Sequence, residues 1–377
     1  MLGFNMVSAP IIYYWLRGQL SSKGKELAPQ DFRCIDPADL LLIRSFAFLI
    51  FSVWGALYIL NVAYSGGIPL LWAVMHSGKT YADFGIPSVG GLALMLRSFV
   101  GVVWMCLFCI TGQKKYLLFV VGLGSLCILE VSRGNLFMYI LQIGCIYLIL
   151  NRMRIRTFLV VAAIVVIAIS LFIFLGTVRG ITGTAATFGA GKTAIANIPP
   201  GLFWAWAYTV STIGNVNHAA AIGIHPHYFP LYSGTLLLPG AIRGLFGASG
   251  APIPLAASSL TAVSAYGPLI ADFGFSGAAI WMAGFQALST YVYIRAKQGS
   301  LVHLVIYPPL FVSIVLSVFN LYAMSMMVVT YPWVAITMRN YVARKRSTAA
   351  SGMGAPDAPK SPRMAPGKRS VPEYNGK

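Results

Sequence analysis

LLFVVGLGSLCILEVSRGNLFMYILQIGCIYLIL, residues 117–150, is one long apolar run that is broken near its middle by Glu130, Ser132, Arg133 and Gly134. The run is long enough for two helices that cross ~30 Å of hydrocarbon, and the break predicts the turn between them. An ionised side chain at bilayer depth costs a few kcal/mol or more, so its default interpretation is functional. We therefore expect a helical membrane protein whose chemistry lies at or near this turn.

The composition of all 377 residues favours the same class. Hydrophobic residues make up 58% of the chain and charged residues 10%, with a mean hydropathy of +0.75, whereas about a quarter of the residues in a soluble domain are charged. Apolar stretches of ~20 residues recur along the chain and exclude a soluble cytosolic or secreted fold. The prediction is an all-α, polytopic integral membrane bundle with about 9–11 transmembrane helices.

The position of the basic residues predicts which side each loop faces. Many of the basic residues lie in short loops between predicted spans, at Lys114, Lys115, 152–156, Arg295 and Lys297, and others follow the last span at Arg339 and 344–346. Positive loops stay in the cytoplasm, so these loops are predicted to lie inside. The predicted spans are 40–64, 92–111, 117–131, 134–150, 157–176, 268–294, 301–319 and 321–338. Alternation along these spans then places 65–91, 130–134, 177–200 and Asn320 outside and the C-terminus inside.

Three further segments complete the organisation of the chain. Residues 1–16 lack the basic start of a signal peptide and contain Pro10, which predicts a short first span or the remnant of one. Residues 177–267 form the largest outer block, in which 201–223 and 231–248 either both cross the membrane or both lie at its outer interface. We favour interfacial or re-entrant helices, because irregular backbone at membrane depth is tolerated only where it lines a cavity. Residues 347–377 predict a disordered cytoplasmic tail after the membrane domain of 1–346.

Three arginines on the predicted outer side, Arg133, Arg179 and Arg243, run against the positive-inside bias. A guanidinium presents a planar fork that fits phosphate oxygens, and the anion found at this depth is a lipid-linked phosphate or pyrophosphate. Two alternatives stay open. The three residues are ordinary loop arginines, or Arg133 forms a structural ion pair with Glu130, three residues away.

Carboxylates and histidines near the outer side are candidates for proton transfer. Asp272 opens a span, where the helix dipole favours an acid, but a carboxylate in a partly dry pocket also suits a general base. His218, His225 and His227 lie in the outer segment without a neighbouring carboxylate or cysteine. They are loop or core histidines, or groups for acid–base work or sugar binding. No metal site is expected from this set.

Five short motifs, in this order, carry a family resemblance: FGIP (84–87), KKYLL (114–118), SRG (132–134), YSGTLLLPGAIRGLFGASGAP (232–252) and YGPLIADFGFSG (266–277). Together the chain resembles the Wzy-type oligosaccharide repeat-unit polymerases of O-antigen and exopolysaccharide synthesis. It departs from their pattern in a start that is short by one span, and in Ala251, where a basic residue often precedes the proline.

The resemblance implies a membrane glycosyltransferase at the outer face of the bacterial inner membrane. It would move the growing chain from undecaprenyl pyrophosphate onto a new lipid-linked repeat unit. Arg133, Arg179 and Arg243 would hold the pyrophosphate, and Asp272 or Glu130 would take the acceptor proton, with His227 or His218 as substitutes. No metal or other cofactor and no nucleic acid is implied. A chain-length co-polymerase and a flippase are the implied protein partners.

Two other functions remain open from the sequence. The chain could be a ligase that moves the finished polymer to a terminal acceptor, or a transporter or flippase for a lipid-linked saccharide. Transporters of this kind often show inverted repeats and charges near the bilayer centre. Here the charged residues that are candidates for the site lie on the predicted outer side, and no repeat is evident.

Overall fold

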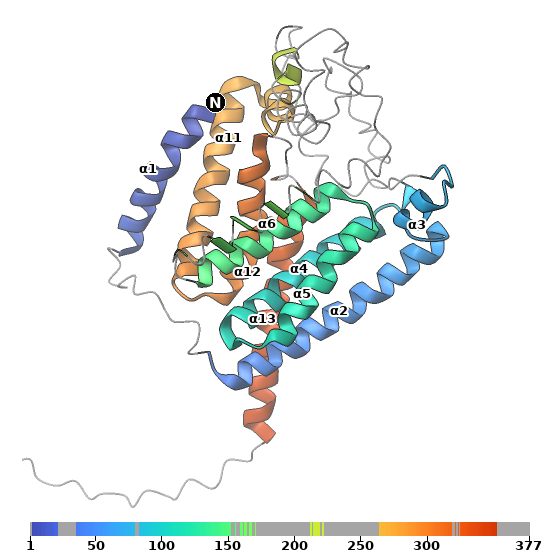
Figure 1. Cartoon of the computed structure of the whole chain (residues 1–377). Coiled ribbons are helices and arrows are strands. Elements are labelled where there is room, and N and C mark those ends of the chain that lie inside the picture. Colours follow the sequence, from blue (N-terminus) through green and yellow to red (C-terminus); the bar gives the residue numbers. More distant parts are fainter. Residues whose placement is uncertain are drawn as a thin grey trace, which may run out of the picture.

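The structure, a computed structural model, describes residues 2–21, 35–79, 83–151, 264–318 and 325–352, together with single residues or short pieces within 155–170, 212–221 and 321–323. All regular elements in this part are helical, which confirms the predicted class (Figure 1). They are α1 (Leu2–Ser21), α2 (Pro37–Ser65), α3 (Pro69–Val74), α4 (Val89–Thr111), α5 (Lys114–Leu129), α6 (Arg133–Leu150), α11 (Tyr266–Lys297), α12 (Leu301–Val315) with the 3-10 turn η6 (Leu316–Val318), and α13 (Met326–Gly352).

Among the described residues, four helical stretches are long and apolar enough to cross a membrane, so the chain is a multi-pass membrane protein. They are Pro37–Val74, which joins α2 and α3, then α4, α6 and α11, and α12 is a shorter apolar helix. The predicted span at 157–176 and the two outer segments at 201–223 and 231–248 lie mostly outside the described residues.

The last helix differs from its prediction. The predicted span at 321–338 is observed as α13, which begins at Met326 and continues to Gly352. Residues 347–352, which were predicted to begin the disordered tail, are helical, and the rest of the predicted tail lies outside the described residues. Ala, Arg and Lys are strong helix formers, and they continue the helix after the apolar residues have ended.

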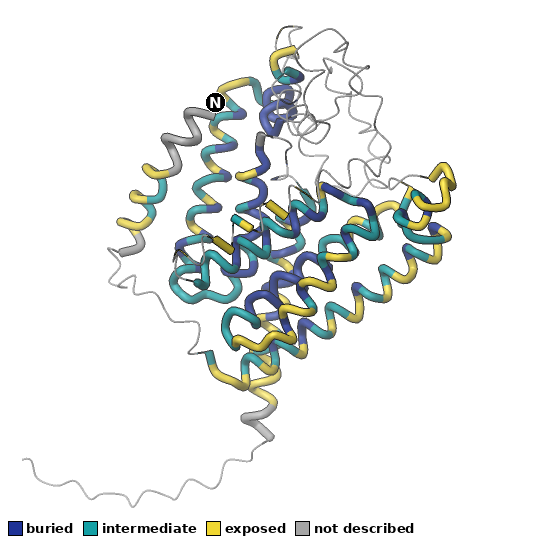
Figure 2. The backbone as a smooth tube through the Cα atoms, in the orientation of Figure 1, coloured by how far each residue is buried: buried dark blue, intermediate teal, exposed yellow. Residues whose placement is uncertain are grey.

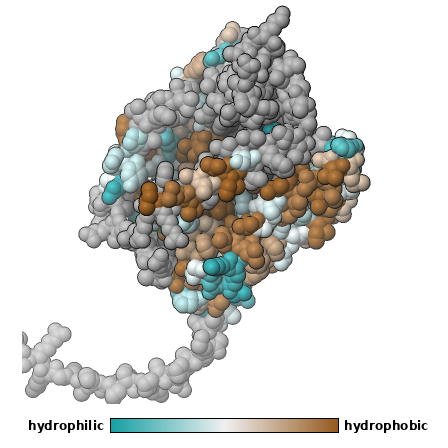
Figure 3. Space-filling model, in the orientation of Figure 1, coloured by the Kyte–Doolittle hydropathy of each residue, from teal (hydrophilic) through white to brown (hydrophobic). Residues whose placement is uncertain are grey.

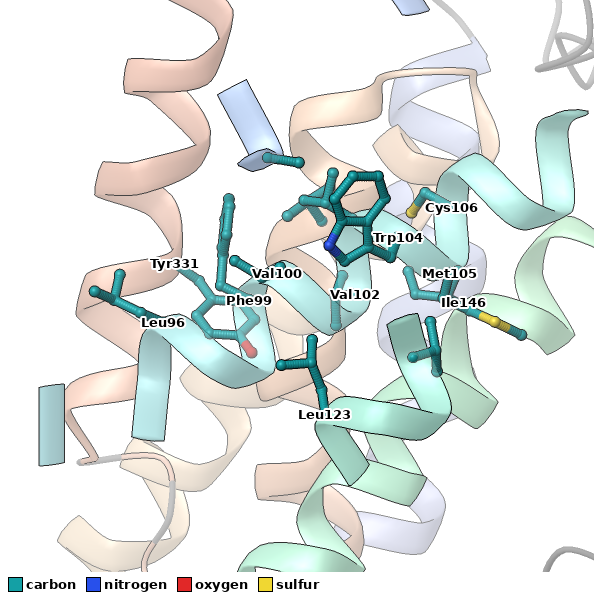
Figure 4. Packing of buried hydrophobic residues seen from close by; sticks show 14 of the residues in the cluster. Leu96, Phe99, Val100, Val102, Trp104, Met105, Cys106, Leu123, Ile146 and Tyr331 are labelled. Carbon is teal, nitrogen blue, oxygen red and sulfur yellow. The ribbon is translucent and has the colours of Figure 1, made fainter. Parts of the chain in front are cut away.

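Helix α4 lies at the centre of the bundle and contacts α2, α5, α6, α12 and α13. Its residues from Leu96 to Leu107 are all buried, as expected for a helix that is apolar on every side. Figure 4 shows Phe99 and Trp104 of α4 among Leu123, Ile146 and Tyr331 from the surrounding helices. Polar groups also join the helices, since the hydroxyl of Tyr331 donates to Oε1 of Gln142 at 2.5 Å.

The surface of the bundle is apolar as well. Figure 2 shows the middle of α4 buried, while exposed positions recur along α2. Figure 3 shows hydrophobic side chains over much of one face. An exposed apolar surface of this extent is unfavourable in water and is expected of helices that face lipid. The exposed large side chains include Leu49, Val53, Ile59, Leu118, Val121, Ile280 and Trp333.

Contacts between helix ends agree with the predicted alternation. Nζ of Lys297 donates to the carbonyl of Ile149 at 3.0 Å, which brings together two predicted cytoplasmic loops. At the opposite end, the amide of Ala265 donates to the carbonyl of Ser317 at 2.8 Å. We call the end with Lys114 and Lys297 the inner end. The end with the α5–α6 turn, residues 130–132, is the outer end.

Candidate functional site

The α5–α6 turn is tight and its backbone is strained. Val131 adopts a left-handed conformation with φ 52°. Its amide donates to Ile128 at 2.9 Å, and the amide of Ser132 donates to Cys127 at 3.0 Å. This pair of bonds is a Schellman motif, which usually places glycine where Val131 stands, because a β-branched side chain is disfavoured at positive φ. The surrounding contacts must therefore hold this turn in place.

The turn is recessed from the outer end of the bundle. Helix α5 has 16 residues, which rise roughly 24 Å and fall short of ~30 Å of hydrocarbon. Figure 1 shows α2 and α3 extending past the turn, and α3 contacts α5. We therefore expect the irregular backbone of the turn to lie at membrane depth, where it is tolerated only if buried in protein or next to water.

Arg97 of α4 forms an ion pair with Glu130 at this turn. Its Nη1 lies 2.7 Å from Oε1 of Glu130, and the side chains are 1% and 11% exposed. The alternative left open by the sequence, an ion pair between Glu130 and Arg133, is not the one observed, because Glu130 pairs with Arg97. Glu130 and Arg133 lie on opposite sides of a turn rather than on one helix face, so the three-residue spacing does not bring them together.

Arg97 was missed by the sequence reasoning, although a signal was present. It is a charged residue inside the apolar run at 92–111, and the same cost of charge in a membrane that singled out Glu130 applies to it. The sequence does not indicate its partner, because that contact joins residues 33 positions apart.

Arg133 is the first residue of α6, and its side chain is 4% exposed. It therefore shares the recessed turn with Glu130 and lies in the same buried region at the outer end. The other two predicted pyrophosphate ligands, Arg179 and Arg243, lie outside the described residues, as does His227.

Asp272 lies beside a break in α11. Gly274 has φ 68° and ψ −179°, a conformation close to glycine-only, so α11 consists of a short first segment and a long second one. The first segment is buried from Tyr266 to Asp272 (Figure 2). The side chain of Asp272 is 4% exposed. The second segment alone is long enough to cross the bilayer. Asp272 thus lies near the N-terminal end of this second segment. There it can stabilise the helix dipole or take part in proton transfer, and both roles remain open.

The piece of chain that carries His218 packs near this segment. Val216 lies against the apolar cluster formed by Tyr266, Leu269 and Ile270. His218 itself is exposed, whereas Asn215 is fully buried. The structure therefore brings the neighbourhoods of two predicted site residues, Asp272 and His218, to one apolar cluster.

The FGIP motif has a structural role at the outer end. The amide of Ile86 donates to Oδ1 of Asn61 at 2.9 Å, and the amide of Gly85 donates to Oγ of Ser65 at 2.7 Å. Asn61 is 1% exposed and lies near the outer end of α2. These bonds fix the loop that leads into α4, the helix that carries Arg97.

The described part of the chain thus holds two groups of predicted site residues. Glu130 and Arg133 share the recessed turn with Arg97, and Asp272 lies with the His218 segment. Helix α12 contacts both α6 and α11 and lies between the groups. Within the described residues, no three His, Cys, Asp or Glu side chains are close enough to hold a metal ion. Comparison of the chain with protein-family models, with curated proteins and with solved structures gave no match.

Proposed function

We propose that this chain is a membrane glycosyltransferase that polymerises undecaprenyl-pyrophosphate-linked oligosaccharide repeat units into an O-antigen or exopolysaccharide. The reaction would take place at the outer face of the bacterial cytoplasmic membrane. The observation that carries the proposal is Arg133, whose guanidinium is buried at the first residue of α6, next to the α5–α6 turn. The pyrophosphate of a lipid-linked sugar lies at a depth comparable to that expected for this turn, and an arginine fork suits its oxygens.

The chemistry assigned to the arginines is stabilisation of a leaving group. The acceptor hydroxyl attacks the anomeric carbon of the growing chain, and the bond from that carbon to the pyrophosphate oxygen breaks. Negative charge then develops on the departing pyrophosphate, and a preorganised guanidinium in a dry site stabilises it most in the transition state. Arg133 has this role in our proposal, with Arg179 and Arg243 as further ligands.

The acceptor hydroxyl must also lose its proton to a base. Glu130 is now the weaker candidate, because Arg97 already balances its charge at 2.7 Å. Asp272 is the stronger one, since it is buried beside a backbone break close to the segment that carries His218. In this proposal Asp272 accepts the proton, with His218 or His227 as the alternative.

The test is the length of the glycan made by arginine variants in living cells. We expect Arg133→Ala to insert normally in the membrane yet to yield only single repeat units, because one charge-stabilising donor contributes about 100-fold or more to the rate. Arg133→Lys should recover part of the polymer, since it keeps the charge without the fork. Arg44→Ala, at the inner end of α2, is the matched control and should leave chain length unchanged.

The products also separate this function from its rivals. Wild-type chain lengths for Arg133→Ala, Arg179→Ala and Arg243→Ala together would contradict the pyrophosphate site. Lipid-linked long chains accumulating in a deletion strain would instead indicate a ligase. Lipid-linked units held on the cytoplasmic face would indicate a flippase.

A further inference from the structure

The ion pair between Arg97 and Glu130 is poorly suited to a stabilising role alone. Only Nη1 of Arg97 is bonded to the carboxylate, and within the described part of the chain Nε and Nη2 have no hydrogen-bond partner. Buried donors without partners are unfavourable, and a buried ion pair can often be replaced by apolar side chains without loss of stability. The pair therefore needs an explanation other than stability.

The position of the pair suggests that explanation. Arg97 lies on α4, the most enclosed helix of the bundle and hence a rigid base. Glu130 is the C-terminal cap of α5, Val131 follows in its strained conformation, and Arg133 begins α6. The contact thus ties a rigid helix to a turn whose conformation is unfavourable for valine.

We propose that Arg97 is a positioning residue, which acts through Glu130 to fix the α5–α6 turn and thereby the direction in which α6 presents Arg133. The inference rests on the proposed function for its catalytic meaning, because Arg133 is the pyrophosphate ligand there. Arg97 itself touches no substrate in this scheme. Arg97 affects only the placement of Arg133. A misplacement of ~1 Å in such a group can reduce a rate about 100-fold.

The first test measures the turn and not the activity. In Arg97→Met/Glu130→Leu, which replaces the pair by apolar side chains of similar size, we expect the melting temperature in detergent to stay at or above that of wild type. Amide hydrogen exchange at Val131 and Ser132 should become at least tenfold faster. Glu130→Gln keeps the shape of the side chain and should also speed up amide exchange at these two residues, but by a smaller factor. Unchanged exchange in both variants would overturn the inference.

The second test measures catalysis with purified protein and lipid-linked repeat units. We expect kcat of Arg97→Met/Glu130→Leu to fall about 100-fold while its global stability is retained. The exchanged pair, Arg97→Glu/Glu130→Arg, should recover activity relative to either of its single substitutions. Arg44→Met is the control for loss of one arginine. A kcat within twofold of wild type, or a loss of activity that only follows a loss of global stability, would contradict the positioning role.

The two proposals fail in different ways. If wild-type protein does not polymerise lipid-linked units, the proposed function is wrong, but the exchange rates still decide whether Arg97 holds the turn. If wild-type protein polymerises them and the paired apolar variant does so equally well, only the positioning role is lost.

Discussion

The loop before α4, which contains residues 84–87, is fixed by hydrogen bonds to single side chains, and Asn61 is the clearest case. Its Oδ1 accepts the amide of Ile86 at 2.9 Å, and its side chain is 1% exposed. Asn61→Ala leaves that amide without its partner, so we expect unfolding to become easier by about 1–3 kcal/mol in detergent. Ser52→Ala is the control, because this exposed hydroxyl bonds only within its own helix. Equal stability of the two variants would show that the loop does not depend on Asn61.

A second residue-scale prediction concerns the close approach of α4 and α6. A methyl group added at Gly101 would overlap the ring of Tyr139, whose hydroxyl donates to the carbonyl of Val120 at 2.8 Å. Gly101→Ala should therefore destabilise the protein by about 1–3 kcal/mol, measured by thermal unfolding.

Gly144 of α6 provides the matched control for Gly101. A methyl group there meets no atom within 4 Å. Gly144→Ala should be neutral or stabilising by about 0.5–1 kcal/mol, because alanine loses less backbone entropy in a helix. Opposite signs for the two substitutions are the expected result, and equal effects would contradict the packing.

At the scale of one element, the break in α11 depends on Gly274. Gly274 has φ 68° and ψ −179°, a backbone conformation that other residues adopt only with strain. We expect Gly274→Ala to cost about 1–3 kcal/mol or to straighten the helix, which would displace Asp272. Thermal unfolding and amide exchange at 266–273 measure these two outcomes.

Gly284, in the continuous part of the same helix, is the control for Gly274. A methyl group there meets nothing within 4 Å, so Gly284→Ala should leave both measurements close to wild type. If Gly274→Ala behaved as Gly284→Ala does, α11 would be one continuous helix.

The elements themselves were largely predictable, but their ends were not. Apolar length located α2, α4, α5, α6, α11 and α12 to within a few residues, because the hydrocarbon core fixes how many apolar residues a crossing needs. The same reasoning stopped α13 too early, since a helix continues into water when its residues favour helix. It also could not reveal the break at Gly274, because glycine is common in membrane helices that are not broken.

For the whole molecule, the sidedness of the bundle can be tested with single cysteines in a variant whose five native cysteines are replaced by serine. Ser77→Cys should react with an impermeant maleimide on intact cells, because its loop lies at the outer end. Gln113→Cys should react only after the membrane is permeabilised, since the adjacent Lys114 and Lys115 keep that loop inside.

The control for this labelling is Leu118→Cys, whose exposed position on α5 is expected to face lipid. It should resist the reagent under both conditions, because a thiol in hydrocarbon neither ionises nor meets a polar reagent. Labelling of Ser77→Cys and Gln113→Cys from the same side would contradict the predicted alternation.

The sequence by itself determined that this is a helical multi-pass membrane protein and located most of its long apolar helices. It also predicts the side that each described loop faces. These conclusions depend on the bilayer, because a helix needs about 20 apolar residues to cross it and basic loops stay in the cytoplasm. It also marked Glu130 and Arg133 as unusual. Only the tertiary structure decided that Glu130 pairs with Arg97 and not with Arg133. Such a pairing depends on which helices pack side by side, and no local pattern of residues records that.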